Sequence, residues 1–282
     1  MKNKFLNEKK IWREKFDSFF LEGKDRENFL NGITTSNLIN NSEELVRTCW
    51  LSPTGILKGL LEIYKDSDKL LILILQGDIK EVKSYFEDII FPFDNVNLSE
   101  NFSTFRTQEI DYINSWRHYQ PSISMNETLQ KSSDNLYKNY INDADLEEWK
   151  IDQAIPILDN INNKKNNPLE LGLTDLIEFN KGCYLGQETM AKLKNVSSLK
   201  QEIRIWKSNK RSNKNFLIKN KNVYLNEKKE TIVGNITYSY LLKDLSIKGL
   251  LMIKRNFLDK NKLFCEDIGT ININKSVSTV FL

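Results

Sequence analysis

The chain has 282 residues, of which 40% are hydrophobic and 28% charged, a balance typical of globular proteins rather than disordered or membrane-spanning ones. Its formal net charge of +3 is far below the basic charge typical of nucleic-acid-binding proteins, so we expect no nucleic-acid partner. The longest apolar run, from Leu70 to Leu75, is much shorter than the roughly 20 residues that cross a bilayer, so we expect no membrane partner and a cytoplasmic location.

The first half of the chain predicts an α+β region. Asp25 follows a glycine and can cap a helix with apolar residues such as Phe29 and Ile33 on one face. Apolar segments separated by turn sequences then predict three strands, at 45–52, 56–64 and 70–76. Further elements are predicted as a helix at 79–90, a strand at 101–110, and a helix at 143–150 capped by Asn142 or Asp143.

The second half begins with a polar run at 160–167, which cannot bury apolar surface and therefore predicts a connection. A short helical turn is expected at 174–179, and a helix from Gln187 towards Lys194. Beyond Lys200, short apolar segments predict the strands of a small barrel or sandwich, at 201–207, 216–219, 231–239, 247–254, 268–273 and 276–281. We therefore expect two regions, 1–198 with two modules and 199–282.

The octapeptide KGCYLGQE, residues 181–188, shows neither helical nor strand periodicity. Gly182 and Gly186 free the backbone to adopt positive φ and to approach another segment closely. Cys183 is expected just ahead of a helix N-terminus and near Lys181, and both features favour the thiolate form. Spacing alone leaves a second interpretation open, in which Cys183 is a small buried packing residue.

The other thiols and the single histidine limit the possible chemistry. Cys49, Cys183 and Cys265 lie far apart without a CxxC pair, so neither a disulfide framework nor a zinc site is indicated. Three cysteines also cannot supply the four thiolates that usually hold an iron–sulfur cluster. His118 lies in a polar stretch and is interpreted as a solvated loop residue.

The pattern K-G-C-Y-x-G-Q-E resembles the signature of the YgfZ family. These folate-binding proteins assist iron–sulfur cluster assembly or repair and are related to the glycine-cleavage T-protein, an aminomethyltransferase. The resemblance extends over most of the chain, through the segments 23–35, 51–64, 149–156, 168–173, 234–239 and 248–255. It implies an α+β, GcvT-like fold of three modules around a central folate cavity, the last module being a C-terminal β-barrel.

The resemblance also implies a cofactor, tetrahydrofolate, and a set of site residues. Cys183 is the candidate functional thiol. Asp152 matches the position of a pterin-pairing acid in the T-protein relatives, although it could equally be a surface charge at a helix end, and Glu170 is a second candidate acid. The full set of cofactor-binding candidates is Asp152, Glu170, Lys181, Tyr184, Gln187, Glu188 and Lys192.

Three positions depart from the pattern of the family. Lys150 and Lys192 stand where arginine is common, which keeps the charge but loses the bidentate fork of a guanidinium. Ile56 follows Gly55 where an arginine is often found, so an anion contact expected there is missing. These departures predict a weaker affinity for folate than in relatives.

The favoured function is a tetrahydrofolate-binding accessory protein that supports the assembly or repair of iron–sulfur proteins, with the motif thiol Cys183 beside the folate cavity. Iron–sulfur proteins or assembly factors are its expected transient partners. The alternative is an aminomethyltransferase that moves a one-carbon unit to tetrahydrofolate. That activity needs a catalytic carboxylate in the N-terminal half, for which the sequence offers Asp78 and Glu81. A thiol redox enzyme ranks last, because Cys183 has no resolving cysteine near it in sequence.

Overall fold

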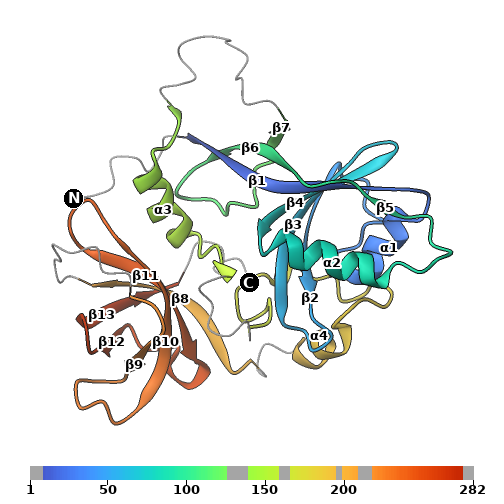
Figure 1. Ribbon diagram of the computed structural model, residues 1–282. Helices are drawn as coiled ribbons and strands as arrows, with labels where there is room; N and C mark the ends of the chain where they lie inside the picture. Colours follow the sequence, from blue (N-terminus) through green and yellow to red (C-terminus); the bar gives the residue numbers. More distant parts are fainter. Residues whose placement is uncertain (1–8, 126–138, 159–165, 195–198, 209–217, 276–282) are drawn as a thin grey trace.

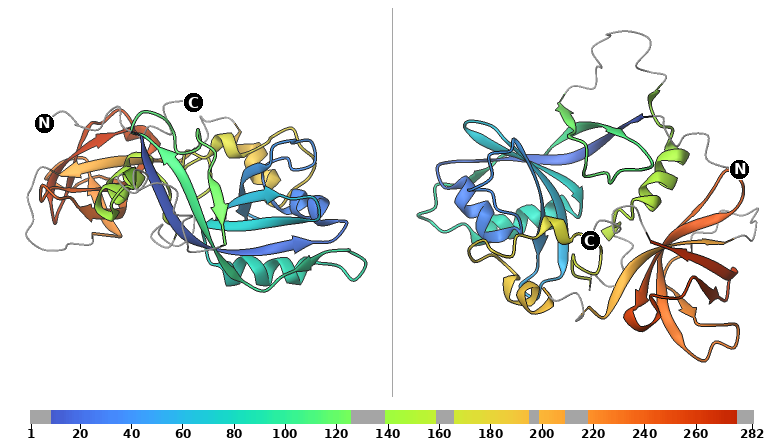
Figure 2. Two further views of the ribbon diagram at one scale, coloured as in Figure 1. Left: turned by 90° about the horizontal axis from the view of Figure 1, so that it is seen from above. Right: turned by 180° about the vertical axis from the view of Figure 1, so that it is seen from behind.

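The computed structural model describes residues 9–125, 139–158, 166–194, 199–208 and 218–275 (Figure 1). The chain forms a curved sheet with its helices, a connecting region and a closed barrel. Helix α3 (Asp143–Asp152) lies between the sheet and the barrel in both Figure 1 and Figure 2. Within the described ranges, every helix is too short or too polar to be a transmembrane segment.

The sheet has seven strands in the order β2-β3-β4-β1-β6-β7, with β5 also paired to β1. Neighbouring strands run antiparallel, as in Glu14 opposite Arg106 and Arg47 opposite Glu62. The strands are β1 (Lys10–Glu22), β2 (Leu45–Leu51), β3 (Leu57–Lys65), β4 (Lys69–Gln76), β5 (Asn97–Leu98), β6 (Phe102–Ile110) and β7 (Ser122–Ser124).

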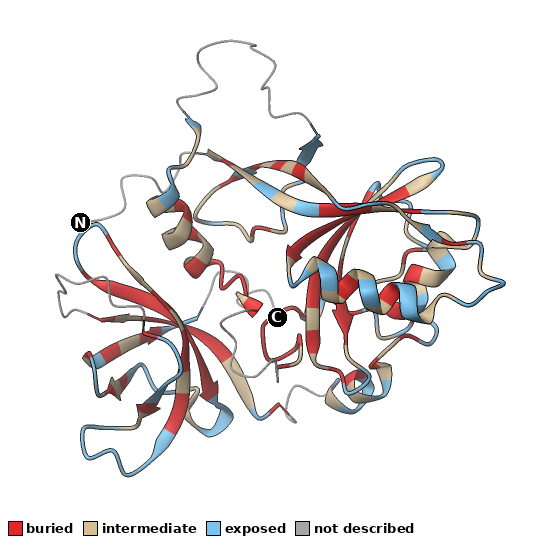
Figure 3. Ribbon diagram, viewed as in Figure 1, coloured by how far each residue is buried: buried red, intermediate tan, exposed pale blue. Residues whose placement is uncertain are grey.

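Helices α1 (Arg26–Ile33) and α2 (Ile79–Ile89) cover one face of this sheet. Leu30 of α1 and Phe86 of α2 are fully buried in a core that they share with Phe19, Ile63 and other sheet residues. The outer surface of α2 is exposed, whereas the strands beneath it are largely buried (Figure 3). Burial of each such side chain contributes about 1.5 to 3 kcal/mol to folding.

The other face of the sheet belongs to a second core that joins the parts of the molecule. Trp12 and Leu75 of the sheet, Trp149 of α3, and Ile203 and Met252 of the barrel are all buried in it. The connecting region adds the 3-10 turn η4 (Thr174–Leu176) and helix α4 (Gln187–Leu193). The sheet, α3 and the barrel therefore pack as one body around a shared centre.

The barrel closes in the order β10-β11-β8-β13-β12-β9. It has its own core, in which Trp206, Ile236 and Leu251 are fully buried. Its strands are β8 (Gln201–Ser208), β9 (Lys221–Tyr224), β10 (Ile232–Leu241), β11 (Ile247–Lys254), β12 (Lys262–Cys265) and β13 (Gly269–Asn274), with the 3-10 turn η6 (Arg255–Phe257) after β11. The expected α+β class with a C-terminal barrel is confirmed.

Most predicted elements are confirmed within a residue or two, among them β2, β3, β4, α2, β6, α3, β8, β10, β11 and β13. Asp25 precedes α1 as predicted, but its carboxylate accepts from the Asn95 amide at 2.9 Å instead of capping the helix. The strand predicted at 216–219 is wrong for Ile218 and Lys219, which lie in a loop. Strands β1, β5, β7 and β9 were not predicted.

Two other predictions fall wholly or mainly on residues outside the described ranges. They are the strand at 276–281 and the connection at 160–167, of which only Asn166 and Asn167 are described. The division into 1–198 and 199–282 stays a prediction.

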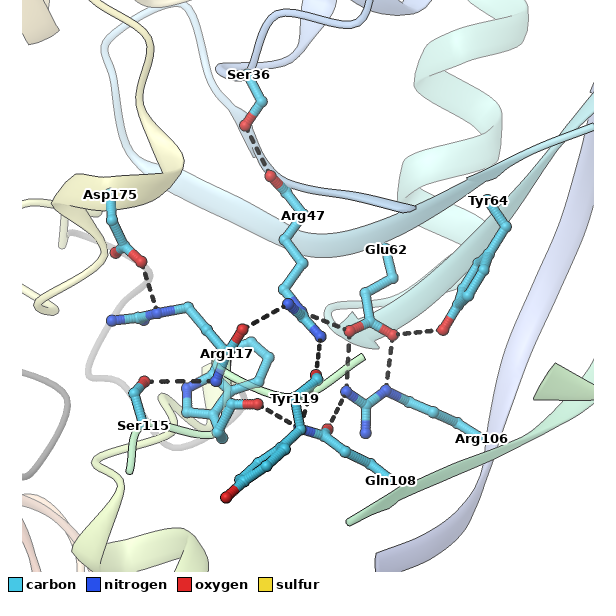
Figure 4. A network of polar contacts seen from close by, with 11 residues as sticks. Ser36, Arg47, Glu62, Tyr64, Arg106, Gln108, Ser115, Arg117, Tyr119 and Asp175 are labelled. Carbon is cyan, nitrogen blue, oxygen red and sulfur yellow. Dashed lines mark hydrogen bonds and ion pairs between the residues drawn. The ribbon is translucent and has the colours of Figure 1, made fainter. Parts of the chain in front are cut away.

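A buried ion network fixes the concave face of the sheet (Figure 4). The Glu62 carboxylate is fully buried and accepts from Arg106 Nε at 2.6 Å and from Arg47 Nε at 2.8 Å. Tyr64 donates its hydroxyl to the same carboxylate at 2.9 Å. Burial alone raises the pKa of Glu62, but the Arg106 and Arg47 guanidinium groups outweigh burial and lower this pKa to about 2.

The same network holds the loop that follows β6. Arg47 donates from Nη1 to the carbonyl of Arg117 at 2.9 Å and from Nη2 to that of Tyr119 at 3.0 Å. Gln108 donates to the carbonyls of Trp116 and Tyr119. The loop is thus anchored to the charged centre of the sheet, and Trp116 is 1% exposed.

Replacing Glu62 by Gln is expected to lower the free energy of unfolding by about 3 to 5 kcal/mol, because two buried guanidinium groups lose their shared carboxylate. Urea denaturation measures this loss. The contribution of Glu62 is present above the pKa of an unfolded glutamate, about 4.3, and is lost as the pH falls towards 2. The free energy of unfolding of Glu62→Gln is therefore expected to fall less than that of the parent as the pH drops from about 4.3 towards 2.

Glu109→Gln is the matched control, since the Glu109 carboxylate pairs with Lys9 on the surface. It is expected to unfold at nearly the same urea concentration as the parent. Equal losses in the two variants would contradict the role assigned to Glu62.

Candidate functional site

The octapeptide loop is anchored by the Lys181 side chain, which is 7% exposed. Its ammonium donates to three backbone carbonyls, those of Asn31 at 2.7 Å, Thr34 at 2.8 Å and Ser36 at 2.7 Å. Asn31 lies in the last turn of α1, whose carbonyls lack partners within the helix. Burial lowers the pKa of Lys181 to about 8, and Glu178 offsets part of this effect. Lys181 therefore ties the loop to the end of α1.

Gly186 lets the loop touch the turn between β2 and β3. It has a φ of 80°, and a Cβ atom there would lie 2.8 Å from the Ser52 carbonyl oxygen and 3.2 Å from the Gly55 Cα. Gly55 has a φ of 77°, and a Cβ atom there would meet Thr189 and Met190 of α4. The expectation of positive φ is confirmed at Gly186 and wrong at Gly182, where φ is not positive.

The Cys183 thiol is exposed, so its interpretation as a buried packing residue is wrong. It precedes α4, whose N-cap is Gly186, as the sequence predicts. Cys49 and Cys265 are buried in β2 and β12. Burial raises the pKa of Cys49 to about 12 and also raises that of Cys265, so neither forms a thiolate readily at neutral pH.

The remaining motif residues have different surroundings. Tyr184 is 6% exposed, and its hydroxyl is buried without a hydrogen-bond partner in the described part of the chain. Gln187 Nε2 donates to the Lys181 carbonyl at 3.4 Å. Glu188 and Lys192 pair with each other at 2.6 Å on the surface of α4, with side chains 84% and 71% exposed. The motif thus provides a structural anchor, an exposed thiol and a solvated helix face.

A cavity of about 30 Å³ lies at the centre of the molecule, between the concave sheet face, the loop after β6, and α3. It is lined by the side chains of Trp12, Glu14, Phe16, Leu60, Leu75, Gln76, Trp116, Lys150 and Ile155. Aromatic and aliphatic walls with a few polar groups are the usual composition of a small-molecule site.

Glu14 and Lys150 form the charged part of this cavity. The Lys150 ammonium lies 2.9 Å from a Glu14 carboxylate oxygen and 5.7 Å from the centre of the Trp12 ring. Glu14 also accepts from Trp12 Nε1 at 2.8 Å. Sequence analysis did not identify Glu14. Residues 12, 14 and 16 lie two positions apart and therefore share one face of β1, so Glu14 places a carboxylate between the aromatic side chains of Trp12 and Phe16.

Asp152 lies on the same helix as Lys150 but contacts the barrel. Its carboxylate is 2.6 Å from the Lys248 ammonium of β11, which also binds Glu148 at 3.1 Å. Burial raises the pKa of Asp152, while Lys248 lowers it in part. Asp152 does not line the central cavity, and in this structure it joins α3 to the barrel.

Glu170 is a buried carboxylate, 6% exposed, held only by amide donors among its described neighbours. Asn166, Asn167 and Gln201 donate to it over 3.3 to 3.5 Å, which are long hydrogen bonds. Burial raises the pKa of Glu170, and these bonds offset only part of the effect. Its backbone carbonyl accepts from the Ile203 amide of β8 at 2.9 Å, so this segment also reaches the barrel.

No family model matches the chain. Among solved structures, the chain is similar to the glycine cleavage system aminomethyltransferase T of Bartonella henselae, with a TM-score of 0.70 over 95% of this chain and 85% of that one. The sequence identity is 9%, so the likeness shows a shared fold, and the expected GcvT-like fold is confirmed.

One relative among curated proteins is a chloroplastic protein of Arabidopsis thaliana, provisionally named a transferase. It is 42% identical over 57 residues, which cover 20% of this chain and only 13% of that protein. Such a short match does not establish the family of the chain.

Replacing Lys181 by Met is expected to lower the free energy of unfolding by about 1 to 3 kcal/mol, because three backbone carbonyls lose their common donor. Thermal and urea unfolding measure the loss, and amide hydrogen exchange should show faster exchange at the end of α1. Lys192→Met is the control, since Lys192 pairs with Glu188 at the surface of α4 and is 71% exposed, and little change is expected. A stable Lys181→Met variant with unchanged exchange would refute the anchoring role.

Proposed function

We propose that this protein is a cytoplasmic, tetrahydrofolate-binding accessory factor of the YgfZ family that supports the assembly or repair of iron–sulfur proteins. The fold is shared with an aminomethyltransferase, but a fold alone does not determine a function. The observation that carries the proposal is the exposed Cys183 thiol in the KGCYLGQE motif. An exposed thiol is accessible as a ligand to a transient partner or its cluster.

The central cavity has suitable chemistry for a pterin ring. The ring presents two adjacent N–H groups, and the two oxygens of the Glu14 carboxylate would each accept a hydrogen bond from one of them. Trp12 and Trp116 supply indole rings as flat walls, and Lys150 supplies a cation. When bound, tetrahydrofolate would supply a carrier of one-carbon units, while these residues would orient it and exclude water.

Binding requires this cavity to widen, because about 30 Å³ is far below the roughly 300 to 1,000 Å³ of ordinary ligand pockets. The Glu14–Lys150 pair joins β1 to α3 at the cavity wall, and its side chains are 35% and 17% exposed. The Lys150 ammonium has a second carboxylate partner, Glu147 at 3.4 Å, so it keeps an ion pair when it releases Glu14. We therefore expect this contact to open when a ligand enters.

The other cofactor-binding candidates remain proposals of unequal support. Glu170 is held by weak bonds and can exchange partners most readily. Asp152 would have to release Lys248, and Lys181 would have to release its carbonyl oxygens. Tyr184, Gln187, Glu188 and Lys192 do not line the central cavity.

The alternative function is an aminomethyltransferase, favoured by the name of the structural relative. The carboxylates that the sequence offers for it are engaged elsewhere: Asp78 caps α2 through the Lys80 amide, and Glu81 pairs with Lys58. Glu14 is the carboxylate that lines the cavity and is the better candidate for that role. A glycine-cleavage assay with lipoyl-bearing H-protein tests this function, and enzyme-like turnover would favour it over the accessory role.

Isothermal titration of tetrahydrofolate into the parent, Glu14→Gln and Asp152→Asn tests the cofactor site. Loss of a charged hydrogen-bond partner costs about 1.5 to 3 kcal/mol, so the variant of the pterin-pairing acid should bind about 10-fold to 150-fold more weakly. The cavity geometry favours Glu14 as this acid. No binding by the parent would refute the cofactor, and equal binding by all three proteins would refute both assignments.

Cys183→Ala is expected to leave folate affinity unchanged, because Cys183 does not line the central cavity. The activity of iron–sulfur enzymes in cells under oxidative stress is expected to fall. Cys265→Ala is the control, since this buried thiol packs in the barrel and its loss should affect stability more than enzyme activity. If Cys183→Ala supports iron–sulfur enzymes as well as the parent does, the proposed role of the Cys183 thiol is wrong.

A further inference from the structure

A groove of about 660 Å³ lies on the surface of the sheet module, between the loop from Ser36 to Glu43, residues 117–120, and residues 175–178. It shares no lining residue with the central cavity, so it is a separate site. Its volume falls within the range of pockets that bind ligands. Neither the cofactor nor the Cys183 thiol accounts for it.

The walls of this groove are mainly polar, unlike those of a typical small-molecule pocket. Amide and hydroxyl side chains from two of its segments line it, namely Ser36, Asn37, Asn40, Asn41, Ser42 and Gln120. None of the described residues that line it is aromatic, so these residues offer no surface for stacking a base or a pterin. The Oδ1 atoms of Asn37 and Asn41 already accept from the Asn40 and Glu43 backbone amides, so the NH2 groups of these side chains are the parts that can meet the C=O groups of an extended polypeptide.

Two arginines form part of the lining but have partners within the protein. The side chains of Arg47 and Arg117 are 9% and 10% exposed. Arg47 binds Glu62 and two carbonyls, and Arg117 Nε lies 2.8 Å from Asp175. Asp175 matches the charge of Arg117, whereas Arg47 shares the Glu62 carboxylate with Arg106. Both arginine side chains are almost buried, while Glu43 and Glu178 are exposed where they line the groove. This distribution favours a partner with cationic side chains.

The groove adjoins the loop that carries the exposed thiol. The Ser36 carbonyl accepts from Lys181, while Ser36 itself lines the groove. Glu178, another lining residue, is three positions before Lys181, and its amide donates to the Thr35 carbonyl at 3.0 Å. A segment bound in the groove would therefore lie beside the Cys183 loop.

We infer that this groove binds an extended segment of a partner polypeptide, with lysine or arginine side chains near Glu43 and Glu178. The amides would pair with the partner's main chain and the two carboxylates would select its charge. The inference rests on the proposed partner-directed role of the Cys183 loop. It identifies the groove as the surface by which a partner is recognised before it meets the thiol.

Fluorescence anisotropy of a labelled short peptide of alternating lysine and serine, at low salt and without tetrahydrofolate, tests this inference on the full chain. The lysine peptide is expected to bind, and its glutamate counterpart is not. The double variant Glu43→Gln, Glu178→Gln should bind at least about fivefold more weakly. Ser42→Trp, which places a bulky ring at an exposed lining position, should also weaken binding without changing the melting temperature.

The double variant Glu227→Gln, Glu230→Gln removes the same charge from exposed barrel positions that do not line the groove, and it is expected to bind like the parent. Absent binding, or binding unaffected by the groove variants, would overturn the inference. If spermidine displaces the peptide when both are present at the same concentration of positive charge, the groove binds small polyamines instead of a polypeptide. Because folate is absent from this assay, its result is independent of the titration that tests the cofactor site.

Discussion

The carboxylate of Glu62, shared by the guanidinium groups of Arg47 and Arg106, is the interaction on which the rest of the structure depends. This one carboxylate holds two guanidinium groups inside a sheet face whose other buried side chains are largely apolar. Arg47 then extends the network to the loop after β6, whose Arg117 pairs with Asp175 of η4. The Leu176 carbonyl of η4 accepts from Thr35 and Ser36, which adjoin the carbonyls bound by Lys181. A connected set of polar contacts therefore runs from the sheet to the thiol loop.

The loop after β6 separates two sites that differ in chemistry. Trp116 lines the central cavity, and the next residue, Arg117, lines the surface groove. Helix α3 shows a similar division, because residues two apart on a helix point about 200° apart. Lys150 therefore faces the sheet while Asp152 faces the barrel. The loop after β6 therefore lines both the proposed cofactor site and the proposed partner site, and α3 places Lys150 at the cofactor site.

Local patterns predicted β2, β3, β4 and α2 well, because each has continuous periodicity and clear turn residues. They did not reveal β1, because three charged residues in a row separate Trp12 from Phe16 and hide the alternation of a strand. Its main partner, β6, also lies far along the chain. The motif itself was evident, but the role of Lys181 was not, because its carbonyl partners lie 145 to 150 residues away. Glu14 was missed for the same reason, because its place in the cavity wall depends on an ion pair with Lys150, which lies on α3 far along the chain.

The unequal burial of the three thiols makes the native chain suitable for selective labelling. A maleimide-linked spin label or fluorophore would react at Cys183 while Cys49 and Cys265 remain shielded. The reporter would then sit on the motif loop without any engineered mutation. Its mobility and emission could follow the arrival of a partner in real time, in a protein whose core has not been altered.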